Sequence, residues 1–148
     1  MVALAIAMLL VGISFNFIGR APSGLLLRNS AADIESFLSS AKNQALFQNK
    51  RISVFFNPET RSFIIKSSTV ENPSVSCRVE GHGDYSLPDG VGMECPNGRE
   101  DEVPVCVFFP DGTSSGGDIR VFIKKRSVVI SISQLTGSIT IKPESVKK

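Results

Sequence analysis

The first 19 residues carry no ionisable side chain, and this uncharged segment is the feature that most limits how the chain folds. A helix of that length is about 28 Å long, close to the roughly 30 Å hydrocarbon core of a bilayer. We therefore predict that residues 1–19 form one membrane-spanning helix. Its apolar side chains include those of Val2, Leu4, Ile6, Leu9, Leu10, Val11 and Ile13.

Two other interpretations of this segment fit the residues less well. A cleaved signal peptide needs a basic start and a small-residue cleavage site, but no basic residue precedes the apolar run and RAPSG follows it. A buried core helix usually has a polar face, whereas this segment is apolar on all sides up to Ser14. A membrane anchor is the interpretation that the residues favour.

Residues 20–29 predict a kink or connector, because Pro22 and Gly24 both disfavour a continuous helix. Arg20 and Arg28 also lie at this end of the apolar segment. The positive-inside rule, taken alone, would place this end in the cytoplasm. Charge therefore leaves the orientation of the anchor open.

A second, amphipathic helix is predicted over residues 30–48, with Asn29 or Ser30 suited to be its N-cap. We expect the apolar stripe of this helix to pack against a sheet. With 148 residues the chain has room for one globular domain, which we place at 30–148. The stripe recurs at helical spacing and consists of Ile34, Leu38, Ala41 and Ala45.

From Lys50 onward the apolar pattern changes to a period of two, which is typical of strands. The segment Asn57–Arg61 has the composition of a hairpin turn. Helices and strands do not alternate, so the expected fold class is α+β, with a helix packed on an antiparallel β-meander. The predicted strands are 52–56, 62–67, 105–109, 119–124, 128–133 and 138–141.

Residues 72–104 form an acidic block between the two groups of predicted strands. The block has seven acidic residues and two arginines, a net charge of −5, so the rest of the chain carries +7 and the whole chain +2. Five glycines and four prolines in the block predict a loop-rich insertion. A functional loop, a disordered segment and a plain insertion all remain open.

Three cysteines lie in or beside the acidic block, at Cys77, Cys95 and Cys106. Outside the cytosol a disulfide is expected, and our first choice is Cys95 with Cys106, because this pair would attach the loop to the next strand. Cys77 is the alternative partner. The three cysteines with His82 have the ligand types of a zinc site, but they lack the C-x-x-C pairs of one. We predict no metal and no cofactor.

Motifs for enzyme chemistry do not occur in the sequence. The chain has no G-x-S-x-G elbow, no Walker loop, no G-x-G-x-x-G and no H-E-x-x-H. The pair Gly116–Gly117 lies between two predicted strands, so we interpret it as a hairpin turn and not as a phosphate loop. The protein is therefore predicted not to be an enzyme.

An apolar helix, an amphipathic helix and a β-meander, in this order, resemble the organisation of type IV pilin-like proteins. Residues 108–137, FFPDGTSSGGDIRVFIKKRSVVISISQLTG, resemble the signature region of the GspH/FimT family of minor pseudopilins and minor pilins. That family has an F-x-P-D-G-x-x-S-G-G hairpin, two strands and then L-T-G. The motif positions are Phe109, Pro110, Asp111, Gly112, Ser115, Gly116, Gly117, Leu135, Thr136 and Gly137.

The resemblance implies a structural subunit at the tip of the type II secretion pseudopilus. Such a subunit is held in the bacterial inner membrane, with its globular domain in the periplasm. Its implied partners are other minor pseudopilins, the major pseudopilin and secreted cargo. Family members begin with a basic leader and G-F-T-L-x-E, whereas Met1 here falls where the residues after that Glu are expected. Either the start codon lies further upstream or the chain is truncated, so the resemblance leaves open whether a prepilin peptidase site precedes Met1.

A FimT-like minor type IV pilin, active in pilus assembly or DNA uptake, is the alternative that the resemblance leaves open. Family members that bind DNA use a basic motif similar to G-R-x-R. The corresponding stretch here, Gly137–Thr140, has no arginine, which favours the H class. The basic residues that keep DNA binding open are Lys124, Lys125, Arg126, Lys142, Lys147 and Lys148.

Overall fold

The structure is a computed structural model that describes residues 22–69, 76–78, 84–95 and 104–144. The predicted membrane helix, His82 and the last two lysines lie outside these residues. Within the described part of the chain, no helix has the length and apolarity that a membrane crossing requires.

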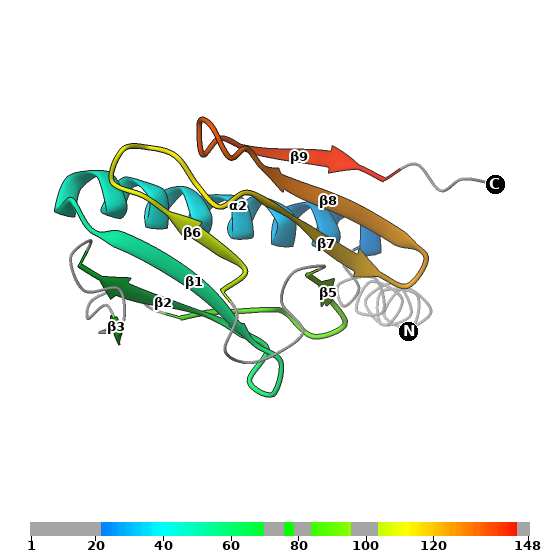
Figure 1. The fold of residues 1–148 in the computed structure, drawn as a ribbon. Helices are drawn as coiled ribbons and strands as arrows, with labels where there is room; N and C mark the ends of the chain where they lie inside the picture. The colour runs from blue at the N-terminus through cyan, green and yellow to red at the C-terminus, as the bar shows by residue number, and fades with distance from the viewer. Residues whose placement is uncertain (1–21, 70–75, 79–83, 96–103, 145–148) are drawn as a thin grey trace, which may run out of the picture.

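One helix and two antiparallel sheets make up the described fold (Figure 1). The helix, α2 (Ser23–Gln48), contacts β1 and β6 of the first sheet and β7, β8 and β9 of the second. The first sheet has the order β3-β2-β1-β6, with β4 beside β2, and the second has the order β5-β7-β8-β9. The strands are β1 (Arg51–Asn57), β2 (Ser62–Ser68), β3 (Ser76–Arg78), β4 (Tyr85–Ser86), β5 (Gly92–Glu94), β6 (Cys106–Phe108), β7 (Gly117–Ile123), β8 (Arg126–Ile132) and β9 (Ile139–Pro143).

The expected α+β class is confirmed, and the six predicted strands correspond to β1, β2, β6, β7, β8 and β9 with ends shifted by at most two residues. The expected single meander is only partly correct. A meander exists in β7-β8-β9, but β1, β2 and β6 belong to a separate sheet. The helix therefore supports two sheets, which it joins through one core.

Helix α2 begins at Ser23, so the predicted N-cap at Asn29 or Ser30 is wrong. Residues 23–29 of the predicted connector are helical. The N-cap is Pro22, whose carbonyl accepts the N–H groups of Leu25 and Leu26 at 2.8 and 3.2 Å. Proline suits the start of a helix because its fixed φ is compatible with the first turn, where its missing N–H is not needed. The helix ends at Gln48, as predicted.

The predicted apolar stripe of α2 is confirmed, because all four of its side chains are fully buried. Two of them are alanines, which allow the helix axis to approach the sheets closely. The core that they enter is shared by both sheets, so it depends on the helix to hold the sheets together. Its fully buried large residues from the strands include Ile52, Val54, Phe63, Phe108, Ile119, Val121 and Ile130.

The predicted hairpin between β1 and β2 is confirmed, with Asn57 opposite Ser62 at its end. The Asn57 side-chain oxygen accepts the backbone N–H groups of Glu59 and Thr60 at 2.9 and 3.3 Å. An asparagine that bonds to the backbone two residues later stabilises a tight turn. The turn is therefore encoded locally.

The prediction that residues 72–104 form a loop-rich insertion is partly wrong. The block contributes β3 and β4, which pair with β2, and β5, which pairs with β7 of the other sheet. Leu87 and Val91, between β4 and β5, are buried in the core. Strands of two or three residues show no periodicity in a sequence, so only their pairing with a longer strand reveals them.

Candidate docking surface at the junction of the two sheets

The motif glycines Gly116 and Gly117 do not form the predicted hairpin turn. Strand β6 before them pairs with β1, whereas β7 after them pairs with β5 and β8. The segment between β6 and β7 is therefore the crossover from one sheet to the other (Figure 1). A hairpin-like turn exists only in its first half, where Phe108 and Ser114 form an isolated antiparallel bridge.

Two adjacent serines in this crossover form hydrogen bonds to different sheets. The hydroxyl of Ser114 donates to the carbonyl of Ser133, at the end of β8, over 2.9 Å. Ser115 Oγ accepts the backbone N–H of Val107 in β6 over 3.0 Å. Neighbouring side chains in an extended segment point in opposite directions, so the serine pair can contact both sheets at once. Ser114 and Ser133 were missed by the sequence motif.

The second motif segment, Leu135–Gly137, lies directly against the first. Gly137 has φ +58°, and a Cβ atom there would lie 2.8 Å from the carbonyl oxygen of Gly112. Glycine is required here both by the positive φ and by the close approach of the two turns. The structure thus brings together motif residues that are more than 20 positions apart in the sequence.

Helix α2 supports the same junction through Lys42. Its ammonium group donates to the carbonyl of Thr136 over 2.8 Å. Leu46, one helical turn later, packs toward Gly112, where a Cβ atom would be 3.7 Å from the leucine methyl group. Both motif turns therefore lie over the C-terminal half of α2 (Figure 1). The sequence alone did not identify Lys42, since its partner is remote in the chain.

The turn at Asp111 is also closed by its own residues. Asp111 Oδ1 accepts the N–H and the hydroxyl of Thr113 at 2.9 and 2.6 Å. The hydroxyl and backbone bonds from Thr113 lower the pKa of the Asp111 carboxyl, because they stabilise its charged form. This aspartate is therefore a turn-forming residue with no described catalytic partner.

Large apolar side chains are exposed at this end of the molecule. Phe47 is 89% exposed, Leu135 is 85% exposed and Leu46 is 41% exposed. We call these three residues the apolar end. Leu46 and Phe47 are neighbours at the C-terminal end of α2, and exposed large apolar side chains near one another are typical of protein contact surfaces.

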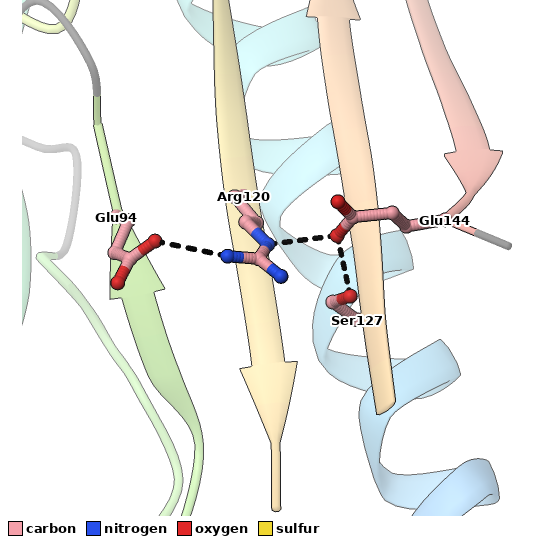
Figure 2. A network of polar contacts seen from close by, with 4 residues as sticks. All are labelled: Glu94, Arg120, Ser127 and Glu144. Atoms are coloured by element: carbon pink, nitrogen blue, oxygen red, sulfur yellow. Dashed lines mark hydrogen bonds and ion pairs between the residues drawn. The ribbon is translucent and has the colours of Figure 1, made fainter. Parts of the chain in front are cut away.

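The opposite end of the second sheet has a polar network centred on Arg120 (Figure 2). Arg120 donates to Glu144 over 2.7 Å and to Glu94 over 3.3 Å, and Ser127 also donates to Glu144. The bond to Glu144 is the main cause of the raised pKa of Arg120, and the bond from Ser127 is the main cause of the lowered pKa of Glu144. The network joins β5, β7 and β8 to the residue after β9, and it neutralises the charge of Arg120.

The predicted disulfide between Cys95 and Cys106 is not present, because both are free thiols. Cys106 begins β6 of the first sheet, whereas Cys95 follows β5 of the second. Burial raises the pKa of each thiol to about 11, which makes both poor nucleophiles near neutral pH. The side chain of Cys77 lies outside the described part of the structure.

The described residues contain no group of three His, Cys, Asp or Glu side chains that could hold a metal ion. His82 lies outside the described ranges, so the structure does not test the zinc interpretation. Taken together, the two sheets meet at a hydrogen-bonded crossover, with the apolar end beside it and the Arg120 network at the opposite end of the second sheet.

No protein-family model matches the sequence. No curated protein matches it either.

The fold of this chain is similar to that of several solved structures. The minor pseudopilin EpsH from the type II secretion system of Vibrio cholerae matches with a TM-score of 0.63 and 13% identity, over 79% of this chain and 96% of EpsH. A crystal structure of the same protein gives a TM-score of 0.62 at 13% identity, over 82% of this chain and 97% of that one.

The type IV minor pilin FimU of Pseudomonas aeruginosa is also similar. It matches with a TM-score of 0.57 and 17% identity, over 79% of this chain and 93% of FimU. At such identities the likeness is one of fold. The chain therefore has the pilin-like fold that the minor pseudopilin EpsH and the minor pilin FimU share.

Proposed function

We propose that this protein is a minor pseudopilin, a non-enzymatic structural subunit at the tip of a type II secretion pseudopilus. The observation that carries the proposal is the match to EpsH, which includes nearly the whole of the EpsH chain. In this proposal residues 1–19 anchor the protein in the bacterial inner membrane and later pack in the filament. The globular domain, which begins with α2 at Ser23, lies in the periplasm in this proposal.

We propose that such a subunit acts by binding partner proteins through a complementary surface. The apolar end, Leu46, Phe47 and Leu135, supplies large side chains that a partner can bury. Beneath it, the bond from Lys42 to Thr136 holds helix and turn in one arrangement, so little conformational entropy is lost on docking. The proposed partners are other minor pseudopilins and the major pseudopilin, with secreted cargo as a further one.

A minor type IV pilin is the second candidate function. The likeness to FimU favours it, because that match covers the same share of this chain as the match to EpsH. The exposed basic residues Lys124, Lys125 and Arg126 would serve DNA uptake in this case. Both candidates are structural subunits of a filament, and they differ in the machine that the filament serves.

Deletion of the gene in the bacterium that encodes it distinguishes the two candidates. A minor pseudopilin is expected to be needed for the export of type II substrates, which should accumulate in the periplasm, while surface pili persist. Loss of pili and of DNA uptake with normal export would instead support the pilin. Normal export, normal pili and normal DNA uptake would contradict both.

Complementation of the deletion then tests the apolar end. Phe47→Glu should fail to restore function, because a buried charge at the interface is costly. Gln48→Glu is the matched control, since it adds the same charge at the next residue, which is exposed and polar. Equal activity of the two variants would exclude Phe47 from the contact surface.

A further inference from the structure

Three consecutive cationic residues lie at the turn between β7 and β8, and none of them has an ion pair with a described residue. Lys124, Lys125 and Arg126 are all exposed. Arg120 on the neighbouring β7 differs from them, because Glu94 and Glu144 neutralise it (Figure 2). The charge of the turn is therefore available to a partner of opposite sign.

The turn lies at the end of the molecule where α2 begins (Figure 1). A Cβ atom on Gly24 would be 2.3 Å from Nη1 of Arg126, so this arginine touches the first turn of the helix. In the first two turns of α2, Leu25 is 51% exposed and Arg28 is also exposed. This end thus presents both cationic groups and an exposed leucine.

The chain between Gly19 and Ser23 is short. Four residue steps extend at most about 14 Å, so the start of α2 stays close to the end of the uncharged segment. If residues 1–19 cross a membrane, as the proposed function requires, the basic turn beside the start of α2 lies near the lipid headgroups. A basic cluster close to an anionic lipid surface is attracted by about 1 kcal/mol per lysine or arginine.

A groove of about 240 Å³ lies beside the turn, lined by Arg120, Phe122, the three basic residues, Ser127 and Glu94. We propose that Lys124, Lys125 and Arg126 bind the phosphate groups of anionic phospholipids on the membrane that holds residues 1–19. The inference rests on the proposed function, because it needs the anchor. DNA is the competing polyanion, but a duplex would not require the cluster to lie beside the anchored end.

Hydrogen exchange of the full chain in vesicles tests this inference. One set of vesicles contains only phosphatidylcholine, and the other also contains phosphatidylglycerol. Flotation first shows whether the chain is inserted. We expect the backbone amides of residues 123–126 to exchange about fivefold more slowly on the anionic vesicles, and high salt to remove the difference.

Charge reversal supplies the matched comparison. Lys125→Glu should abolish the lipid-dependent protection, whereas Lys50→Glu, at the other end of α2, should leave it unchanged. Both lysines are exposed, so neither change is expected to unfold the domain. Loss of protection in both variants would show that the net charge of the protein causes the lipid-dependent protection. That result would overturn the assignment of lipid binding to the turn between β7 and β8.

The remaining outcomes separate the inference from the proposed function. Insertion into both vesicles with equal exchange would overturn the inference and leave the anchor intact. Failure to float with either vesicle would overturn both. Slower exchange with a short DNA duplex, but not with phosphatidylglycerol, would overturn lipid binding in favour of DNA.

Discussion

The ammonium group of Lys42 lies 2.8 Å from the backbone carbonyl of Thr136, to which it donates a hydrogen bond across 94 positions of sequence. This contact joins α2 to the turn between β8 and β9. The same turn rests on the crossover between the two sheets through Gly137 and Gly112. The Lys42 side chain therefore links α2 to the turn that contacts the crossover between the two sheets.

Lys42→Met keeps most of the aliphatic stem and removes this bond. We expect the free energy of unfolding to fall by about 1 kcal/mol, the usual net worth of such a bond, and the amide of Gly137 to exchange faster. Urea unfolding and hydrogen exchange measure the two effects. Lys50→Met is the control. An equal loss of unfolding free energy in both variants would show that the bond between Lys42 and Thr136 does not contribute to stability.

Gly137→Ala should be more destabilising than Gly90→Ala. Both glycines have positive φ, +58° and +85°, so both changes strain the backbone. Only at Gly137 would the new methyl group also meet a backbone atom, whereas Gly90 faces open space. We expect a loss of about 1 to 3 kcal/mol at Gly137 and about 1 at Gly90 by urea unfolding. The reverse order would contradict the contact between the two motif turns.

Ser114→Ala should weaken the junction between the sheets. The buried hydroxyl of Ser114 donates to Ser133 and accepts the N–H of Gly116, so its removal leaves two backbone groups without this partner. The expected cost is about 1 to 3 kcal/mol in thermal or urea unfolding. Ser36→Ala, at an exposed position of α2, should change stability by less than about 0.5 kcal/mol. Similar values for both would argue that water replaces the Ser114 hydroxyl.

Alkaline pH should destabilise the protein through its buried thiols. Burial raises the pKa of Cys106 from 9.0 to about 11, so the unfolded chain loses this proton at a lower pH than the folded one. The free energy of unfolding should therefore be unaffected by this group below pH 9, and fall by about 1 to 3 kcal/mol as pH rises toward 11. Urea unfolding across that range should show a smaller slope for Cys106→Ala than for the wild type. An unchanged slope would mean that the thiol is not desolvated.

Much of the described fold could be predicted because its signals are local. The stripe from Ile34 to Ala45 repeats with the helical period, and all four of its residues are buried as expected. The turn at Asn57 is stabilised by bonds within a few residues. Such features depend on neighbours in the chain, so the order of residues is sufficient to reveal them.

The start of α2 was predicted incorrectly because two local signals competed. Pro22 and Gly24 suggested a break, and Asn29 and Ser30 suggested a cap, whereas Pro22 itself begins the helix. Ser30 instead bonds to the Leu26 carbonyl inside the helix over 2.9 Å. Leu27 is buried in the core, and this tertiary contact favours the longer helix over the weaker capping signal.

By itself, the sequence determined the α+β class, the buried face of α2, the longer strands and the turn between β1 and β2, since each depends on periodicity or on bonds between near neighbours. Only the tertiary structure decided that the strands divide into two sheets, that the acidic block supplies edge strands to both, and that the Gly116–Gly117 segment crosses between them. The physical reason is that strand pairing satisfies backbone groups far apart in the chain. Which strands pair depends on the core that α2 and both sheets bury together.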